Sequence, residues 1–97
     1  MKTATKRLFI KRCEKLNVTW SDNGYGIAID APSGKVFSQY GTHSEMIYFN
    51  DSWKRNEIYG ELMYAMAEGL SVCSDKDCEI CYAGEDLHPT INVYAHE

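Results

Sequence analysis

The chain has 97 residues, of which 44% are hydrophobic and 25% charged, and its formal net charge is −4. This length supports one domain, residues 1–97, with a single modest core, and the composition is typical of a globular protein rather than a disordered one. No run approaches the roughly 20 apolar residues of a membrane span, and no signal peptide follows the basic N-terminus, so we expect a cytoplasmic protein.

The first predicted element is an amphipathic helix of about three turns. Phe9, Cys13 and Leu16 recur at i, i+4 and i+7 with basic residues between them, which indicates one apolar face. Asn17 can end such a helix. The apolar run at residues 8–10 would also allow a strand, so both alternatives stay open.

Three strands are predicted in the middle of the chain. Residues 25–29 alternate apolar and small or polar side chains, the turn-forming residues 31–34 follow, and residues 35–38 return to extended chain. Residues 43–49 predict a third strand, covered on both faces. Near the C-terminus, residues 91–94 permit a fourth.

A second helix is predicted from Ser52 to Glu68, because N-capping residues precede an apolar set at helical spacing. Gly60 lies inside it, which suggests that another backbone packs close by, and Gly69 follows its end. The predicted fold class is therefore α+β, a small antiparallel β-meander of three or four strands packed by two helices, with a cysteine-rich loop.

Three of the four cysteines, Cys73, Cys78 and Cys81, fall within nine positions. Clustered thiolates can close around one soft cation, and Zn²⁺ then needs one further donor to complete a tetrahedron. A reducing cytosol favours metal ligands or free thiols over disulfides. The cluster therefore predicts a zinc site, with an acidic loop of free thiols as the alternative.

Three residues remain open as the fourth donor: His88, His96 and Cys13. We prefer His88, because it follows Cys81 in a loop before Pro89 that can turn back on the cysteines. The Cys-x4-Cys-x2-Cys spacing also resembles the cluster-binding run of plant-type ferredoxins, but no cysteine follows Cys81. A redox Cys-x-x-Cys site is disfavoured, because the surrounding acidic residues raise a thiol pKa.

Residues 1–15 hold six basic residues against Glu14, whereas the rest of the chain carries a net −9. The basic segment could contact phosphates, and the element order matches that of the double-stranded-RNA-binding domain, with Lys54 and Arg55 at the second helix. The acidic remainder would repel a polyanion, and glutamates occupy that helix. We therefore expect a solvated face and treat nucleic-acid binding as the alternative function.

No catalytic constellation is evident, so we predict that the protein is not an enzyme. His43 is interpreted as an ordinary strand or loop residue, because Ser44 and Glu45 beside it would point to alternating faces of a strand and form no nucleophile–base pair with it. Protein binding needs exposed aromatic side chains instead. The candidates, which flank loops or element ends, are Tyr40, Tyr48, Trp53 and Tyr82.

Several short motifs carry a resemblance across residues 25–81: Ile-Asp-Ala-Pro-Ser-Gly-Lys-Val-Phe ending at Phe37, Gly-Thr-His ending at His43, Trp53 before a helix, and the cysteine run. In these the chain resembles small uncharacterised accessory proteins of tailed bacteriophages. The resemblance implies a protein made in a bacterial cytoplasm that modulates or inhibits a host protein. The predicted function is a non-enzymatic, zinc-stabilised protein-binding module, with a nucleic-acid binder or a thiol or metal redox protein as alternatives.

Overall fold

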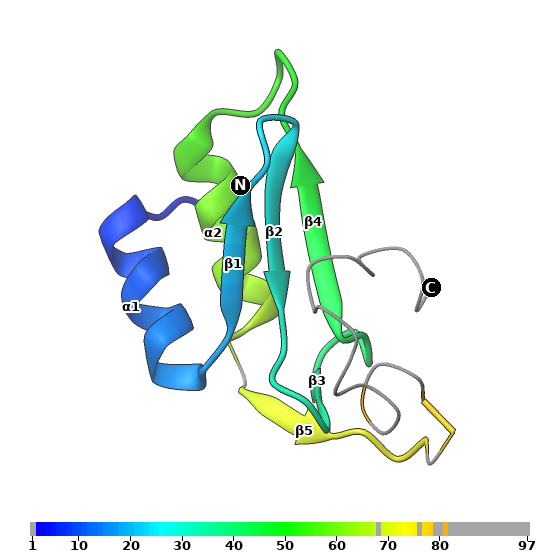
Figure 1. The fold of residues 1–97 in the computed structure, drawn as a ribbon. Coiled ribbons are helices and arrows are strands. Elements are labelled where there is room, and N and C mark those ends of the chain that lie inside the picture. The colour runs from blue at the N-terminus through cyan, green and yellow to red at the C-terminus, as the bar shows by residue number, and fades with distance from the viewer. Residues whose placement is uncertain (1, 68, 76, 79–80, 82–97) are drawn as a thin grey trace.

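A computed structural model describes residues 2–67, 69–75, 77–78 and 81 (Figure 1). Two helices and two small antiparallel sheets confirm the predicted α+β class. None of the described helices is both long and apolar enough to cross a bilayer. The elements, in chain order, are α1 (Lys6–Leu16), β1 (Thr19–Asp22), β2 (Gly26–Asp30), β3 (Lys35–Phe37), β4 (Ser44–Tyr48), α2 (Arg55–Ala65) and β5 (Leu70–Val72).

The first helix forms as predicted, and the strand alternative for residues 8–10 is wrong. Thr5 caps its N-terminus, where the Thr5 hydroxyl accepts a hydrogen bond from the Leu8 N–H at 3.3 Å. Asn17 ends it in the left-handed conformation with φ of 57°, and its N–H bonds back to the last turn. Phe9 and Cys13 are buried on its inner face.

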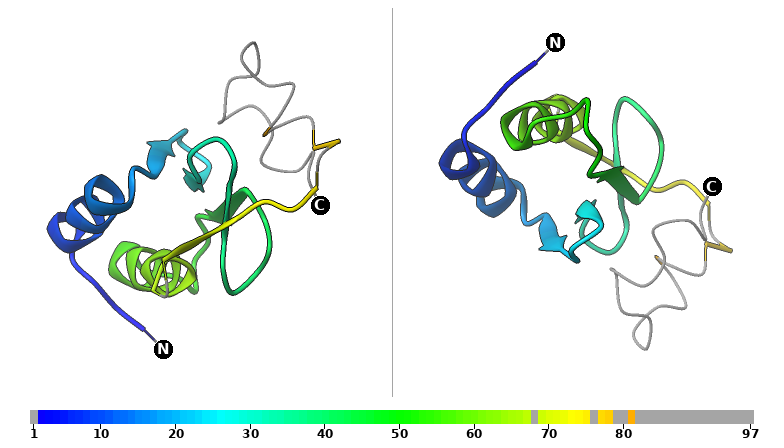
Figure 2. Two further views of the ribbon diagram at one scale, coloured as in Figure 1. Left: turned by 90° about the horizontal axis from the view of Figure 1, so that it is seen from below. Right: turned by 90° about the horizontal axis from the view of Figure 1, so that it is seen from above.

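The main sheet has the strand order β1-β2-β4, with both neighbouring pairs antiparallel. Both helices lie against the same face of this sheet (Figure 2). Ile27 and Ile29 on β2 enter the core between the sheet and the helices, where Phe9 packs edge-on against Trp20 at 5.6 Å between ring centroids. This layer contains most of the buried apolar side chains that the structure describes.

Strand β1 was not predicted, although a local signal for it exists. Asn23-Gly24 is a favoured hairpin pair, and here the Asn23 side chain accepts hydrogen bonds from the N–H groups of Tyr25 and Gly26 at 2.8 and 2.9 Å. Gly24 supplies the positive φ of 85° that the turn needs. The resulting hairpin gives the sheet its first edge strand.

Residues 35–38 were predicted to form a hairpin with residues 25–29, and this is wrong. The turn before β3 lies one residue later than predicted, with the Lys35 N–H bonded to the Pro32 carbonyl at 3.0 Å and Gly34 at φ 82°. The chain therefore leaves the main sheet, and β3 pairs with β5 in a separate two-stranded sheet.

The prediction that residues 43–49 are covered on both faces is also wrong, because β4 is an edge strand among the described strands of the main sheet and is mostly half-buried. The predicted strand at residues 91–94 lies outside the described residues.

Helix α2 is shorter than the predicted span of residues 52–68. Asn50 folds the preceding residues into a turn by accepting the Ser52 N–H at 2.9 Å on its side chain. The helix begins only after Lys54, whose N–H is capped by Glu57 at 3.3 Å. Gly69 takes a positive φ of 80° beyond its end, as expected of a glycine at that place.

At Gly60 we expect an alanine substitution to have the opposite effect on stability from the one that helix propensity predicts. The N-terminal segment crosses α2 there, and a Cβ on Gly60 would lie 2.5 Å from the carbonyl carbon of Lys2 and 2.6 Å from Cα of Thr3. In a free helix Gly→Ala gains up to about 1 kcal/mol. Here we expect Gly60→Ala to lower the free energy of unfolding by about 1–3 kcal/mol through overpacking, measured by urea denaturation.

The control for Gly60→Ala is the same substitution in a chain that lacks residues 1–3. With the crossing segment gone, alanine should stabilise the helix. Stabilisation of the full-length chain by Gly60→Ala would instead contradict the packing of Lys2 and Thr3 across α2.

Candidate metal centre

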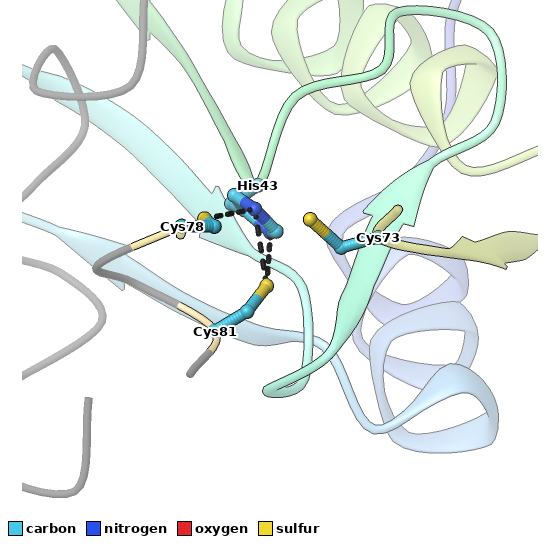
Figure 3. Close-up of side chains that lie close together, drawn as sticks. All are labelled: His43, Cys73, Cys78 and Cys81. Atoms are coloured by element: carbon cyan, nitrogen blue, oxygen red, sulfur yellow. Dashed lines mark hydrogen bonds between the residues drawn. The ribbon is translucent and has the colours of Figure 1, made fainter. Parts of the chain in front are cut away.

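Four buried side chains with metal-binding donor atoms meet beside the small sheet: His43, Cys73, Cys78 and Cys81. Their ligand atoms all lie within 4.8 Å of one another. Figure 3 shows Cys73 to the right of the His43 ring, Cys78 to its left and Cys81 below it. Within the described part of the chain none of the three cysteines forms a disulfide, and Val36 packs against them.

His43 is held at both its backbone and its ring. It lies directly before β4, and its carbonyl accepts the Ala31 N–H at 2.7 Å. The ring Nδ1 lies 2.7 Å from the carbonyl oxygen of Lys35. Because a carbonyl can only accept, Nδ1 carries the proton, and Nε2 is left with its lone pair. An imidazole in this tautomer can bind a metal through Nε2.

The cysteines are tied to the same turn that holds His43. Cys73 follows β5, and its N–H donates to the Gly34 carbonyl at 2.9 Å. The Ser33 hydroxyl donates to the Cys81 carbonyl at 3.0 Å. The Cys78 N–H donates to the Asp75 carbonyl at 3.2 Å, which closes a local turn between the first two cysteines. The turn at residues 32–35 thus connects the histidine and the cysteine segments.

The sulfur atoms of Cys78 and Cys81 lie close to the ring nitrogens of His43. Sγ of Cys78 lies 3.1 Å from Nε2, and Sγ of Cys81 lies 3.1 Å from Nε2 and 3.3 Å from Nδ1. Three sulfurs and one imidazole nitrogen form a donor set that structural zinc sites use. His43 and the three cysteines therefore form a possible metal site, and their donor set fits Zn²⁺.

Burial, with the neighbouring Cys73 and Cys78 thiols adding to its effect, raises the pKa of the Cys81 thiol to about 12. Thiolates are the form that binds metal, so a cation entering this site must displace protons. Metal binding is consequently expected to weaken as the pH falls.

A buried carboxyl group lies near this end of the main sheet. Asp30 ends β2 opposite Ser44 and is 3% exposed. Burial raises its pKa to about 7, and Oδ2 has no hydrogen-bond partner among the residues that the structure describes. Asp30 is not part of the four-residue donor cluster.

The structure brings together the three cysteines that the sequence singles out, and it adds His43, which the sequence analysis had interpreted as an ordinary strand or loop residue. His88, the preferred fourth donor, and His96 lie outside the described residues. Cys13 is buried in the main core beside Phe9, in a different cluster from the other cysteines. It therefore does not supply the fourth donor for either a zinc site or an iron–sulfur cluster.

No local signal marks His43 as a ligand. Its partner cysteines begin 30 residues later in the chain, and the contact depends on β3 leaving the main sheet to pair with β5. The sequence did indicate that a histidine was a candidate, because a cluster of three cysteines needs one more donor and the chain has three histidines.

The aromatic residues that the sequence predicts for partner binding differ in their exposure to solvent. Tyr40 is 48% exposed and Tyr48 is 51% exposed. Trp53 is half-buried against the main core. Tyr82 lies outside the described residues. Two of the four candidates therefore present rings to solvent.

Comparison of the chain with family models, with curated proteins and with solved structures gives no match. The interpretation of the site accordingly rests on its donor set, its burial and its geometry.

Proposed function

We propose that the chain is a non-enzymatic, zinc-stabilised module that binds another protein. The proposal that the chain binds zinc is supported by the set of four donors that His43 and the three cysteines form. Catalytic zinc sites keep one position for water or substrate, whereas four protein donors fill the tetrahedron. A zinc ion held by this set would serve the fold rather than a reaction.

A structural ion would stabilise a part of the chain that has few other interactions. Strands β3 and β5 have three residues each, and within the described part of the chain they form a sheet of two strands. Isolated two-stranded sheets are marginally stable in water. Zinc bound to Cys73 at the end of β5 and to His43 before β4 would join this sheet to the main one.

The partner is proposed from exposed aromatic side chains. Tyr40 lies near Tyr64 on α2 and near two carboxylates, Glu45 and Glu61. Partial burial, with these neighbours adding to it, raises the pKa of Tyr40. Exposed tyrosines beside carboxylates suit a basic protein surface. The resemblance to phage accessory proteins makes a bacterial host protein the proposed source of that surface.

The partner proposal is tested by a pull-down from bacterial lysate with Tyr40→Ala/Tyr48→Ala as bait. We expect this variant to lose a protein that the wild type retains, because two exposed rings are removed without opening the core. The matched control is Arg7→Ala, which truncates an exposed side chain on α1, a helix that packs beside β1 and not beside β4.

Circular dichroism and zinc content establish that each bait is folded. Equal recovery by all three baits, or recovery of nucleic acid in place of protein, would contradict the proposed partner surface.

A further inference from the structure

A hollow of ≈ 230 Å³ lies between the two helices, on a surface that neither the metal site nor Tyr40 uses. It is lined by Leu8, Lys11, Arg12 and Lys15 of α1 and by Met63 of α2. The four α1 residues follow one another at i, i+3, i+4 and i+7, so they form one stripe along the helix. The stripe is about 12 Å long, at 1.5 Å per residue.

The hollow combines apolar and cationic groups. Leu8 is 53% exposed, although large apolar side chains of α1 such as Phe9 are buried. Among the described residues, Arg55 and Asp22 form an ion pair. The side chains of Lys11, Arg12 and Lys15 form no ion pair with any described residue. Three basic side chains without an ion pair among the described residues thus surround an exposed apolar surface.

We propose that this hollow binds an acidic amphipathic helix of another protein. One apolar side chain of that helix would enter between Leu8 and Met63, and its carboxylates would meet Lys11, Arg12 and Lys15. A cavity of about 150 Å³ is known to hold a benzene-sized group, so the space suffices for one leucine or phenylalanine side chain.

The apolar part of the hollow favours a peptide over a nucleic acid. A phosphate backbone would satisfy the cations but offers no group to cover Leu8 and Met63. The net −9 of residues 16–97 would also oppose a long polyanion. A short acidic helix presents both carboxylates and an apolar stripe within the length of the hollow.

The proposal goes beyond the proposed function, and rests on it only in that the chain is a binding module. The test uses a designed peptide of about 18 residues, long enough to form a helix, with leucines at i, i+3, i+4 and i+7 and glutamates on the flanking positions. Calorimetry at low ionic strength measures its binding to the zinc-loaded chain. The control peptide has the same composition with its leucines spread around the helix.

We expect the patterned peptide to bind with a Kd below about 1 mM. Lys11→Glu/Lys15→Glu should weaken binding at least about tenfold, because attraction becomes repulsion at two positions. Leu8→Ser should weaken it about fivefold through lost apolar contact. The matched control is Arg7→Glu, which reverses one exposed charge on the same helix outside the hollow and should weaken binding less than either Lys11→Glu or Lys15→Glu alone.

Three results would overturn the proposal: no binding of the patterned peptide at 1 mM, equal binding of the control peptide, or tighter binding of a duplex DNA of equal charge. Zinc content and melting temperature separate this proposal from the proposed function. Lys11→Glu/Lys15→Glu should retain the zinc content and melting temperature of the wild type. If this variant holds zinc but no longer distinguishes the two peptides, the loss is due to the hollow and not to the metal site.

Discussion

Replacing His43 by alanine is expected to lower zinc affinity by on the order of 100-fold or more, because one of four ligands is lost and structural zinc sites bind their ion with only about 10–16 kcal/mol in total. The melting temperature in saturating zinc should fall with it. Competition with a chromophoric chelator measures the affinity, and differential scanning calorimetry measures the melting temperature.

Two control variants show whether the effect belongs to His43. His43→Cys should retain zinc, because four-cysteine sites are an established structural type. His88→Ala tests the residue that the sequence favoured as the fourth donor, and it should keep the wild-type affinity if His43 fills that position. Loss of zinc by His88→Ala together with retention by His43→Ala would contradict the geometry of the site.

Truncating Leu62 on α2 is expected to cost about 2–5 kcal/mol in free energy of unfolding. Its side chain is 1% exposed in the core between the helices and the main sheet, so Leu62→Ala removes apolar contacts and leaves a cavity. Urea denaturation of the zinc-loaded chain measures the change.

The matched control for Leu62→Ala is Asn56→Ala, an exposed position on the same helix that should stay within about 0.5 kcal/mol of the wild type. A cost for Leu62→Ala as small as that of the control would show that the apolar stripe of α2 is a docking surface and not part of the core.

The elements that local sequence specifies were predictable. Helix α1 has both its apolar period and its ending residue, Asn17, in the sequence, and its bounds follow from them. The same local reasoning explains Gly60, where the close approach of another backbone was expected and Lys2 and Thr3 provide it. Strand β1 was also accessible through Asn23-Gly24, a hairpin signal that the sequence analysis did not use.

Long-range pairing was not predictable. Residues 35–37 have the composition of a strand in any environment, but they pair with β5 instead of β2, after a turn that lies one residue later than predicted. The cysteine cluster could be found because its members are close in sequence. His43 could not, since its place beside the cysteines depends on that same long-range pairing.

The central claim is that His43, Cys73, Cys78 and Cys81 hold one structural zinc ion. Elemental analysis of the chain purified without chelator, combined with a melting curve before and after treatment with a strong chelator, tests it most directly. We expect one zinc per chain and a markedly lower melting temperature after its removal. A metal-free chain whose melting curve the chelator leaves unchanged would contradict the claim.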